Sequence, residues 1–180
     1  MKKYTLIILV LFVGAFLGGC SGMNVQNHKG VKPHFEPLKY FDGEIKAWGT
    51  FEGRWGEVKR QFSARFKGER TGDTLQLEEV IEYKNGDTET RSWTITKTSP
   101  HEYEFFSEQI QSPPAQANVY GNAMNMNYVL TVDTGEGSKW ALRFDDWMFL
   151  QDKKTLINRA TVSYYGFTVG NVHLFYRKMI

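Results

Sequence analysis

Two adjacent carboxylic acids, Asp145 and Asp146, stand between the aromatic residues Phe144 and Trp147. A carboxyl group in apolar surroundings has a raised pKa and can act as a general acid or base. Neighbouring residues on a strand point to opposite faces, however, so these two cannot work together as a catalytic pair. We therefore predict that Asp145 and Asp146 form a structural polar knot with Arg159. One aspartate is expected to be buried and bonded to the guanidinium group, favoured as a bidentate bond, or to backbone N–H groups, while the other faces water and Trp147 packs inward.

Other residues that support catalysis or metal binding are too scattered to form a motif. The four histidines, His28, His34, His101 and His173, show no spacing typical of a pair of metal ligands. The sequence also lacks a nucleophile elbow, a glycine-rich phosphate loop and a dinucleotide fingerprint. We expect no catalytic residue, no metal and no cofactor, although an enzyme of an unrecognised type stays open as an alternative.

The amino terminus has the layout of a bacterial lipoprotein signal. Lys2 and Lys3 precede an apolar stretch of 11 residues, 6–16, which is too short to span a bilayer of about 30 Å. Residues 17–20, Leu-Gly-Gly-Cys, then match a lipobox, and Cys20 is the only cysteine in the chain. We predict a signal peptide over residues 1–19, with diacylglyceryl and palmitate-type acyl groups on Cys20 that anchor the protein in the membrane.

The residues after the cysteine indicate where the anchored protein is expected to lie. Ser21, rather than an aspartate, follows Cys20, which resembles the sorting signal for the outer membrane in bacteria with two membranes. Residues 20–37 are polar, contain glycine and proline, and show no apolar period, so we predict a flexible tether there. The expected location is the periplasmic face of the outer membrane, with a single domain over residues 38–180.

Charge and composition narrow the classes of function. The 22 basic and 20 acidic residues become 20 of each once Lys2 and Lys3 are removed with the signal. A nucleic-acid-binding protein shows a clear basic excess, so we expect no nucleic-acid partner. The content of 13 Phe, 9 Tyr and 5 Trp argues for a packed domain rather than a disordered chain.

Apolar and polar residues alternate through most of the chain after residue 40. The apolar positions of residues 58–66 are even-numbered, which is typical of strands with one buried face. The parity changes between Leu77 and Val80, which is compatible with a β-bulge near Glu78 and Glu79. Asn85-Gly86 predicts a type I′ hairpin turn. Turns recur every 8–14 residues, so we predict an all-β antiparallel fold of nine or ten strands, either a barrel or a sandwich.

One set of large apolar residues could line a cavity inside this fold. Met side chains adapt to varied ligands, and the same residues could equally form an ordinary core. The candidate cavity residues are Met124, Met126, Tyr128, Trp140, Phe144 and Phe175.

Several sequence blocks resemble a known family. They include YFDG at 40–43, FDDWM at 144–148, INRA at 157–160 and FYR at 175–177. With their spacing over about residues 35–178, they are similar to the uncharacterised bacterial lipoproteins called domain of unknown function 3833. The resemblance implies an envelope lipoprotein built like a small lipocalin-like barrel, and it provides no catalytic residue to carry over to this sequence.

The sequence is compatible with two different functions. The first is a non-enzymatic lipoprotein whose barrel binds a small apolar or amphipathic ligand, such as a lipid. The second is a structural or assembly factor with a filled core that acts through its surface in an outer-membrane complex. A cavity of about 300–1,000 Å³ favours the first, whereas a packed interior with a large exposed apolar patch favours the second.

Overall fold

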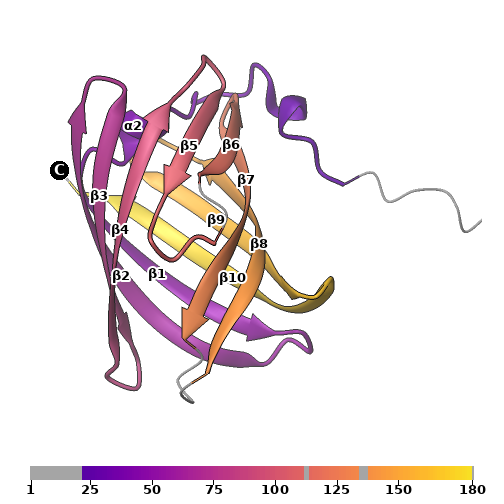
Figure 1. The fold of residues 1–180 in the computed structure, drawn as a ribbon. Coiled ribbons are helices and arrows are strands. Elements are labelled where there is room, and N and C mark those ends of the chain that lie inside the picture. The colour runs from indigo at the N-terminus through magenta and orange to yellow at the C-terminus, as the bar shows by residue number, and fades with distance from the viewer. Residues whose placement is uncertain (1–21, 112–113, 134–137, 180) are drawn as a thin grey trace, which may run out of the picture.

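The computed structural model describes residues 22–111, 114–133 and 138–179. The predicted signal peptide, residues 1–19, and the predicted lipidation site, Cys20, lie outside the described residues. The described chain contains a 3₁₀ helix, a short α-helix and ten strands (Figure 1). No described helix is long and apolar enough to cross a membrane. The elements are η1 (Val25–His28), α2 (Pro37–Tyr40), β1 (Gly43–Gly53), β2 (Val58–Thr71), β3 (Thr74–Tyr83), β4 (Thr88–Lys97), β5 (Glu102–Phe106), β6 (Ala115–Tyr120), β7 (Ala123–Asp133), β8 (Lys139–Leu150), β9 (Thr155–Tyr164) and β10 (Phe167–Lys178).

The described strands form one closed antiparallel barrel. Each strand pairs with the next along the chain, and β1 pairs with β10 to close the ring. Trp48 lies opposite Phe175 in this closing pair. The prediction of an antiparallel lipocalin-like barrel is confirmed, and the sandwich alternative is excluded because a sandwich leaves sheet edges unpaired. Nine of the strands follow the sequence pattern, but β6 was not singled out, since only Ala115, Ala117 and Val119 alternate in it.

The inward positions keep one parity along β3, and this places a carboxylic acid inside the barrel. Leu75, Leu77, Glu79 and Ile81 are all buried, and the pairings of β3 with β2 and β4 run without a register shift. The bulge considered at this point is therefore absent from β3. Glu79 takes an inward position, because strict alternation along a strand leaves it no other face.

The turn after β3 differs from the predicted type I′ hairpin. The Tyr83 N–H donates to the carbonyl oxygen of Asp87 at 2.9 Å, and the Gly86 N–H donates to that of Tyr83 at 3.0 Å. Gly86 has φ +95°, whereas Asn85 is not among the residues with positive φ. The loop is a three-residue hairpin with a glycine bulge, so the type I′ prediction is wrong here.

The amino-terminal segment belongs to the folded domain. Val25 in η1 is buried with Ala123 and Trp147 on the outside of the barrel. Phe35 and the residues around α2 then join the main core and close one end of the barrel, and Figure 1 shows α2 at that end. Residues 24–37 belong to the segment predicted as a flexible tether, but they pack against the barrel. Val25 is buried on its outer face, and Phe35 is buried in the core at its closed end.

Candidate ligand-binding cavity

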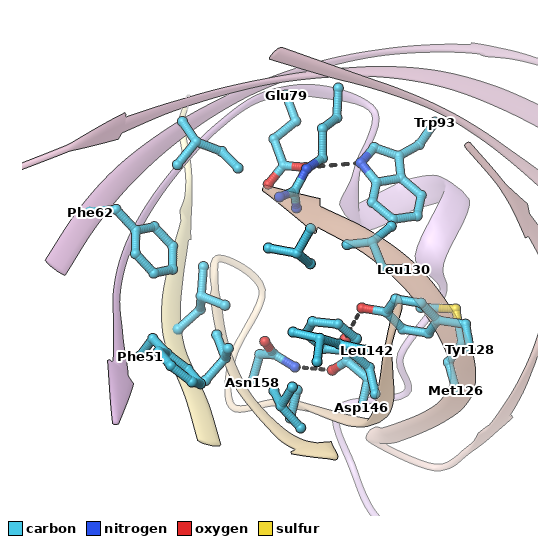
Figure 2. A pocket seen from close by; sticks show the side chains of 18 of the residues that line it. Phe51, Phe62, Glu79, Trp93, Met126, Tyr128, Leu130, Leu142, Asp146 and Asn158 are labelled. Atoms are coloured by element: carbon cyan, nitrogen blue, oxygen red, sulfur yellow. Dashed lines mark hydrogen bonds between the residues drawn. The ribbon is translucent and has the colours of Figure 1, made fainter. Parts of the chain in front are cut away.

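A cavity of about 390 Å³ occupies the interior of the barrel. Its volume lies within the range usual for small-molecule sites. Phe41 and Tyr176 bound it toward the end that α2 closes. Toward the other end the lining includes the exposed residues Lys59 and Asp133 at hairpin ends, so the cavity opens there. Its wall is mostly aromatic and aliphatic, with two polar groups on different sides (Figure 2).

The first polar group is centred on Glu79 of β3. The Trp93 indole N–H donates to Oε2 of Glu79 at 2.9 Å, and both residues point into the cavity (Figure 2). Arg91 lies two residues before Trp93 on β4, and its Nε donates to Glu89 Oε1 at 2.8 Å. The Tyr83 hydroxyl donates to the other Glu89 oxygen at 3.0 Å. Arg91 is thus paired with Glu89 and interacts electrostatically with Glu79, and only 13% of its side chain is exposed.

Burial and the neighbouring charges together set the pKa values in this group. Burial raises the pKa of Glu79, while Arg91 and the Trp93 N–H act in the opposite direction. Burial by itself lowers the pKa of Arg91, but Glu79 and Glu89 more than offset this, and the net pKa lies above its usual value. Burial, assisted by Glu89, raises the pKa of Tyr83 to about 12. The guanidinium charge is therefore the fixed charge of this wall.

The second polar group is centred on Asp146 of β8. The Tyr128 hydroxyl donates to Asp146 Oδ2 at 3.1 Å, and the Asn158 amide donates to Oδ1 (Figure 2). The same amide donates to the carbonyl oxygen of Trp147 at 3.0 Å, which fixes its orientation. Burial raises the pKa of Asp146 to about 7, although the bonds from Asn158 and Tyr128 favour the charged form. Near neutral pH this carboxyl group therefore exchanges between a hydrogen-bond donor and a negative charge.

The predicted knot of Asp145, Asp146 and Arg159 is not assembled in the structure. Asp146 faces the cavity, whereas Asp145 faces outward and accepts bonds from Asn125 Nδ2 at 2.8 Å and from the Trp147 indole N–H at 3.1 Å. Arg159 is also on the outer face, where it contacts Met23 Sδ at 3.4 Å. The sheet separates Arg159 from Asp146, so the predicted pairing is wrong.

The neighbours of the predicted knot follow the same alternation. Asn158 lies one position before Arg159 on β9 and points inward, so it takes the place predicted for the arginine. Trp147 was predicted to pack inward. It points away from the lumen and is buried beneath Val25 instead. Both corrections follow from the period of two along β8 and β9.

The six candidate cavity residues divide into three groups. Met126, Tyr128 and Phe144 line the cavity, and Tyr128 stacks on Phe144 with ring centroids 5.2 Å apart. Met124 is buried in the core without lining the cavity. Trp140 and Phe175 lie elsewhere.

Trp140 and Phe175 are not part of the cavity wall. Trp140 is near the open end and stacks on Tyr164 at 4.9 Å. Phe175 lies on the outer face beside Trp48, because its neighbour Tyr176 takes the inward position on β10. The assignment of these two residues to the cavity is therefore corrected.

Glu79, Arg91 and Asn158 were not identified from the sequence as site residues. The signal for Glu79 was its inward parity among the leucines and Ile81 of β3. Among residues 22–111, 114–133 and 138–179, no three His, Cys, Asp or Glu side chains are grouped to hold a metal ion. The arrangement suits the binding of a molecule with a large apolar part and a few polar atoms, which the two polar groups can orient.

Comparison with known proteins supports the fold and the family. The S-type phycobiliprotein lyase CPES from Guillardia theta is 5% identical, with a TM-score of 0.58 over 79% of this chain and 91% of that one. A protein of unknown function from the DUF3598 family of Nostoc punctiforme is 13% identical, with a TM-score of 0.56 over 88% of this chain and 53% of that one. No curated protein matches significantly. The model of a family described as "Protein of unknown function (DUF3833)" matches residues 14–178, so the chain belongs to the DUF3833 family.

Proposed function

We propose that this protein is a non-enzymatic binder of a small apolar or amphipathic ligand, which it holds inside the barrel. The observation that carries the proposal is the cavity of about 390 Å³ with a mostly apolar wall. Side chains can fill the interior of a small barrel completely, so a space of this size is not a necessary consequence of the fold. The assembly-factor alternative assumed a filled core and therefore has less support.

The two polar groups give the ligand its expected chemistry. Arg91 offers a fixed positive charge, and Asp146 offers a carboxyl group whose charge changes near neutral pH. Apolar side chains such as Leu130 and Leu142 line the cavity together with them (Figure 2). A molecule with an extended apolar body and one or two polar groups matches this distribution.

The proposal includes a location. Acylation of Cys20 would anchor the barrel at the periplasmic face of the outer membrane, where apolar and amphipathic molecules are abundant. The support is the lipobox at residues 17–20 and the preceding apolar stretch. An anchored binder would take its ligand from the membrane or hold it close to the membrane.

A cavity-filling substitution tests the proposal. Ala160 is buried and lines the cavity, so Ala160→Phe places a ring inside it. We expect at least a tenfold loss of affinity for an environment-sensitive apolar dye such as N-phenylnaphthylamine, measured by fluorescence titration. Thr161→Phe adds the same ring on the opposite face of β9 and is expected to change affinity less than twofold.

Circular dichroism and melting curves must show that the variants fold, and Ala160→Leu replaces Ala160→Phe if the larger ring prevents folding. Unchanged dye binding by a folded Ala160 variant would mean that the cavity is not the binding site.

A further inference from the structure

An apolar row crosses the outer face of four adjacent strands. The register places Trp48 of β1 opposite Phe175 of β10, Phe175 opposite Ile157 of β9, and Ile157 opposite Phe149 of β8. We call these four residues the apolar belt. Trp48, Phe175 and Ile157 are 50%, 42% and 44% exposed, and the rings of Trp48 and Phe175 are 6.3 Å apart. Large side chains that stay exposed in one continuous row indicate a contact surface.

The amino-terminal segment covers one end of the apolar belt. Phe149 packs against the buried cluster of Val25, Ala123 and Trp147, and its ring lies 5.5 Å from that of His28. Met23, at the start of the described chain, lines a surface groove together with Trp48, Ile157 and Phe175. The described chain therefore begins on the apolar belt, beside its exposed part.

The length of chain before Met23 limits where the predicted anchor can be. Cys20 precedes Met23 by three residues, and three extended residues span at most about 10 Å. Acyl chains on Cys20 would then enter the bilayer within that distance of Met23. A tether this short holds the face that carries the apolar belt near the membrane and keeps the rest of the barrel farther away.

Basic residues flank the apolar belt on both sides. Lys46 and Arg177 are opposite each other in the next outward row toward the closed end, and His173 and Arg159 are opposite each other in the next row toward the open end. Acidic residues also lie near these rows: Glu52 Oε2 is 3.7 Å from His173 Nε2, and Glu82 pairs with Ser63, which pairs with Trp48. Exposed tryptophan and phenylalanine between basic residues is the composition of surfaces that bind at the headgroup level of anionic membranes.

We propose that the apolar belt is a membrane-docking surface. The rings of Trp48 and Phe175 enter the lipid at headgroup depth, and the flanking basic residues contact the anionic headgroups of phospholipids. The proposal rests on the acylation of Cys20, which holds this face against the bilayer. It goes beyond ligand binding, because it fixes which side of the barrel faces the lipid.

Quenching of tryptophan fluorescence by brominated phospholipids tests this orientation. The full-length protein, purified from a bacterial host that acylates lipoproteins, is reconstituted in vesicles of phosphatidylethanolamine and phosphatidylglycerol. Part of the phosphatidylglycerol carries bromine on its acyl chains. We expect clear quenching in the unmodified protein and the loss of at least half of the quenched signal in Trp48→Phe.

Trp55→Phe is the matched control. Trp55 is 81% exposed at the tip of the β1–β2 hairpin, near the open end of the barrel and away from the apolar belt. We expect this variant to keep the quenching of the unmodified protein. If Trp55→Phe loses the quenching instead, the open end faces the lipid and the proposal is wrong. The proposal is also wrong if Trp48→Phe keeps the full quenching of the unmodified protein. That result is expected, for example, if a second copy of the chain covers the apolar belt and keeps Trp48 away from the lipid.

Three readouts separate this proposal from the others. The mass of the purified chain reports acylation, and flotation with vesicles reports anchoring, so failure of the anchor is seen independently. Dye binding in Trp48→Phe is expected to equal that of the unmodified protein, because Trp48 does not line the cavity. A variant that no longer docks on the membrane but still binds the dye therefore retains the proposed ligand-binding function.

Discussion

Replacing Arg91 by methionine is expected to lower the free energy of unfolding by about 3–5 kcal/mol, the usual cost of removing one partner of a buried ion pair. Arg91 forms an ion pair with Glu89, and its charge also interacts with Glu79, which is buried in the cavity wall. Arg91 lowers the pKa of Glu79, so without the guanidinium charge this buried carboxyl group, hydrogen-bonded to the Trp93 N–H, must either stay charged in apolar surroundings or take up a proton more readily. Denaturant unfolding at pH 7 measures the effect.

Two further variants define the origin of this loss. Glu79→Gln combined with Arg91→Met should lose less than the sum of the single changes, because the double variant leaves no uncompensated charge on Glu79. Arg65→Met is the control, since the Arg65–Glu82 bond of 2.6 Å lies on the exposed surface and its loss should cost less than about 1 kcal/mol. A cost below about 1 kcal/mol for Arg91→Met would contradict the ion-pair account.

Asp146→Asn is expected to change how stability depends on pH. Burial raises the pKa of Asp146 from 3.8 to about 7, so the folded protein binds this proton more tightly than the unfolded chain does. The resulting stabilisation is complete below pH 4 and is lost as the pH rises through 7. A rise of that size corresponds to about 4 kcal/mol.

The difference between the unmodified protein and Asp146→Asn isolates this effect, because other titrating groups are common to both. We expect the free energy of unfolding of the unmodified protein, minus that of Asp146→Asn, to fall between about pH 4 and pH 7 and to stay constant above pH 8. Carbon-13 NMR of the Asp146 carboxyl group gives the titration directly, with a midpoint expected near 7. A midpoint near 4 and a constant difference in stability would show that Asp146 is solvated like a surface carboxylate.

The sequence predicted the individual strands better than the closure of the barrel. Alternation within single strands is a local property, and it identified nine of the ten strands in the described part of the chain. The pairing of β1 with β10 joins residues such as Trp48 and Phe175 from the two ends of the domain. No local pattern reports that contact, which is why a barrel and a sandwich could not be told apart.

The site was predicted in part for the same reason. Asp146 was identified together with Asp145 as part of a structural knot, whereas it lies in the cavity wall. Its partner was misassigned by one residue, because the choice between Asn158 and Arg159 depends on the register of β9 against β8. The packing of η1 was also missed, since Val25 is a single apolar residue in a polar segment and its partners Ala123 and Trp147 are about a hundred residues away.

Native mass spectrometry of the full-length protein, purified in mild detergent from the bacterial envelope, tests the ligand-binding claim most directly. The account predicts a population with one additional small apolar or amphipathic molecule bound, and it predicts that this population disappears in folded Ala160→Phe but persists in Thr161→Phe. A protein that carries no such molecule, and binds none when offered lipids extracted from the envelope, would contradict the account.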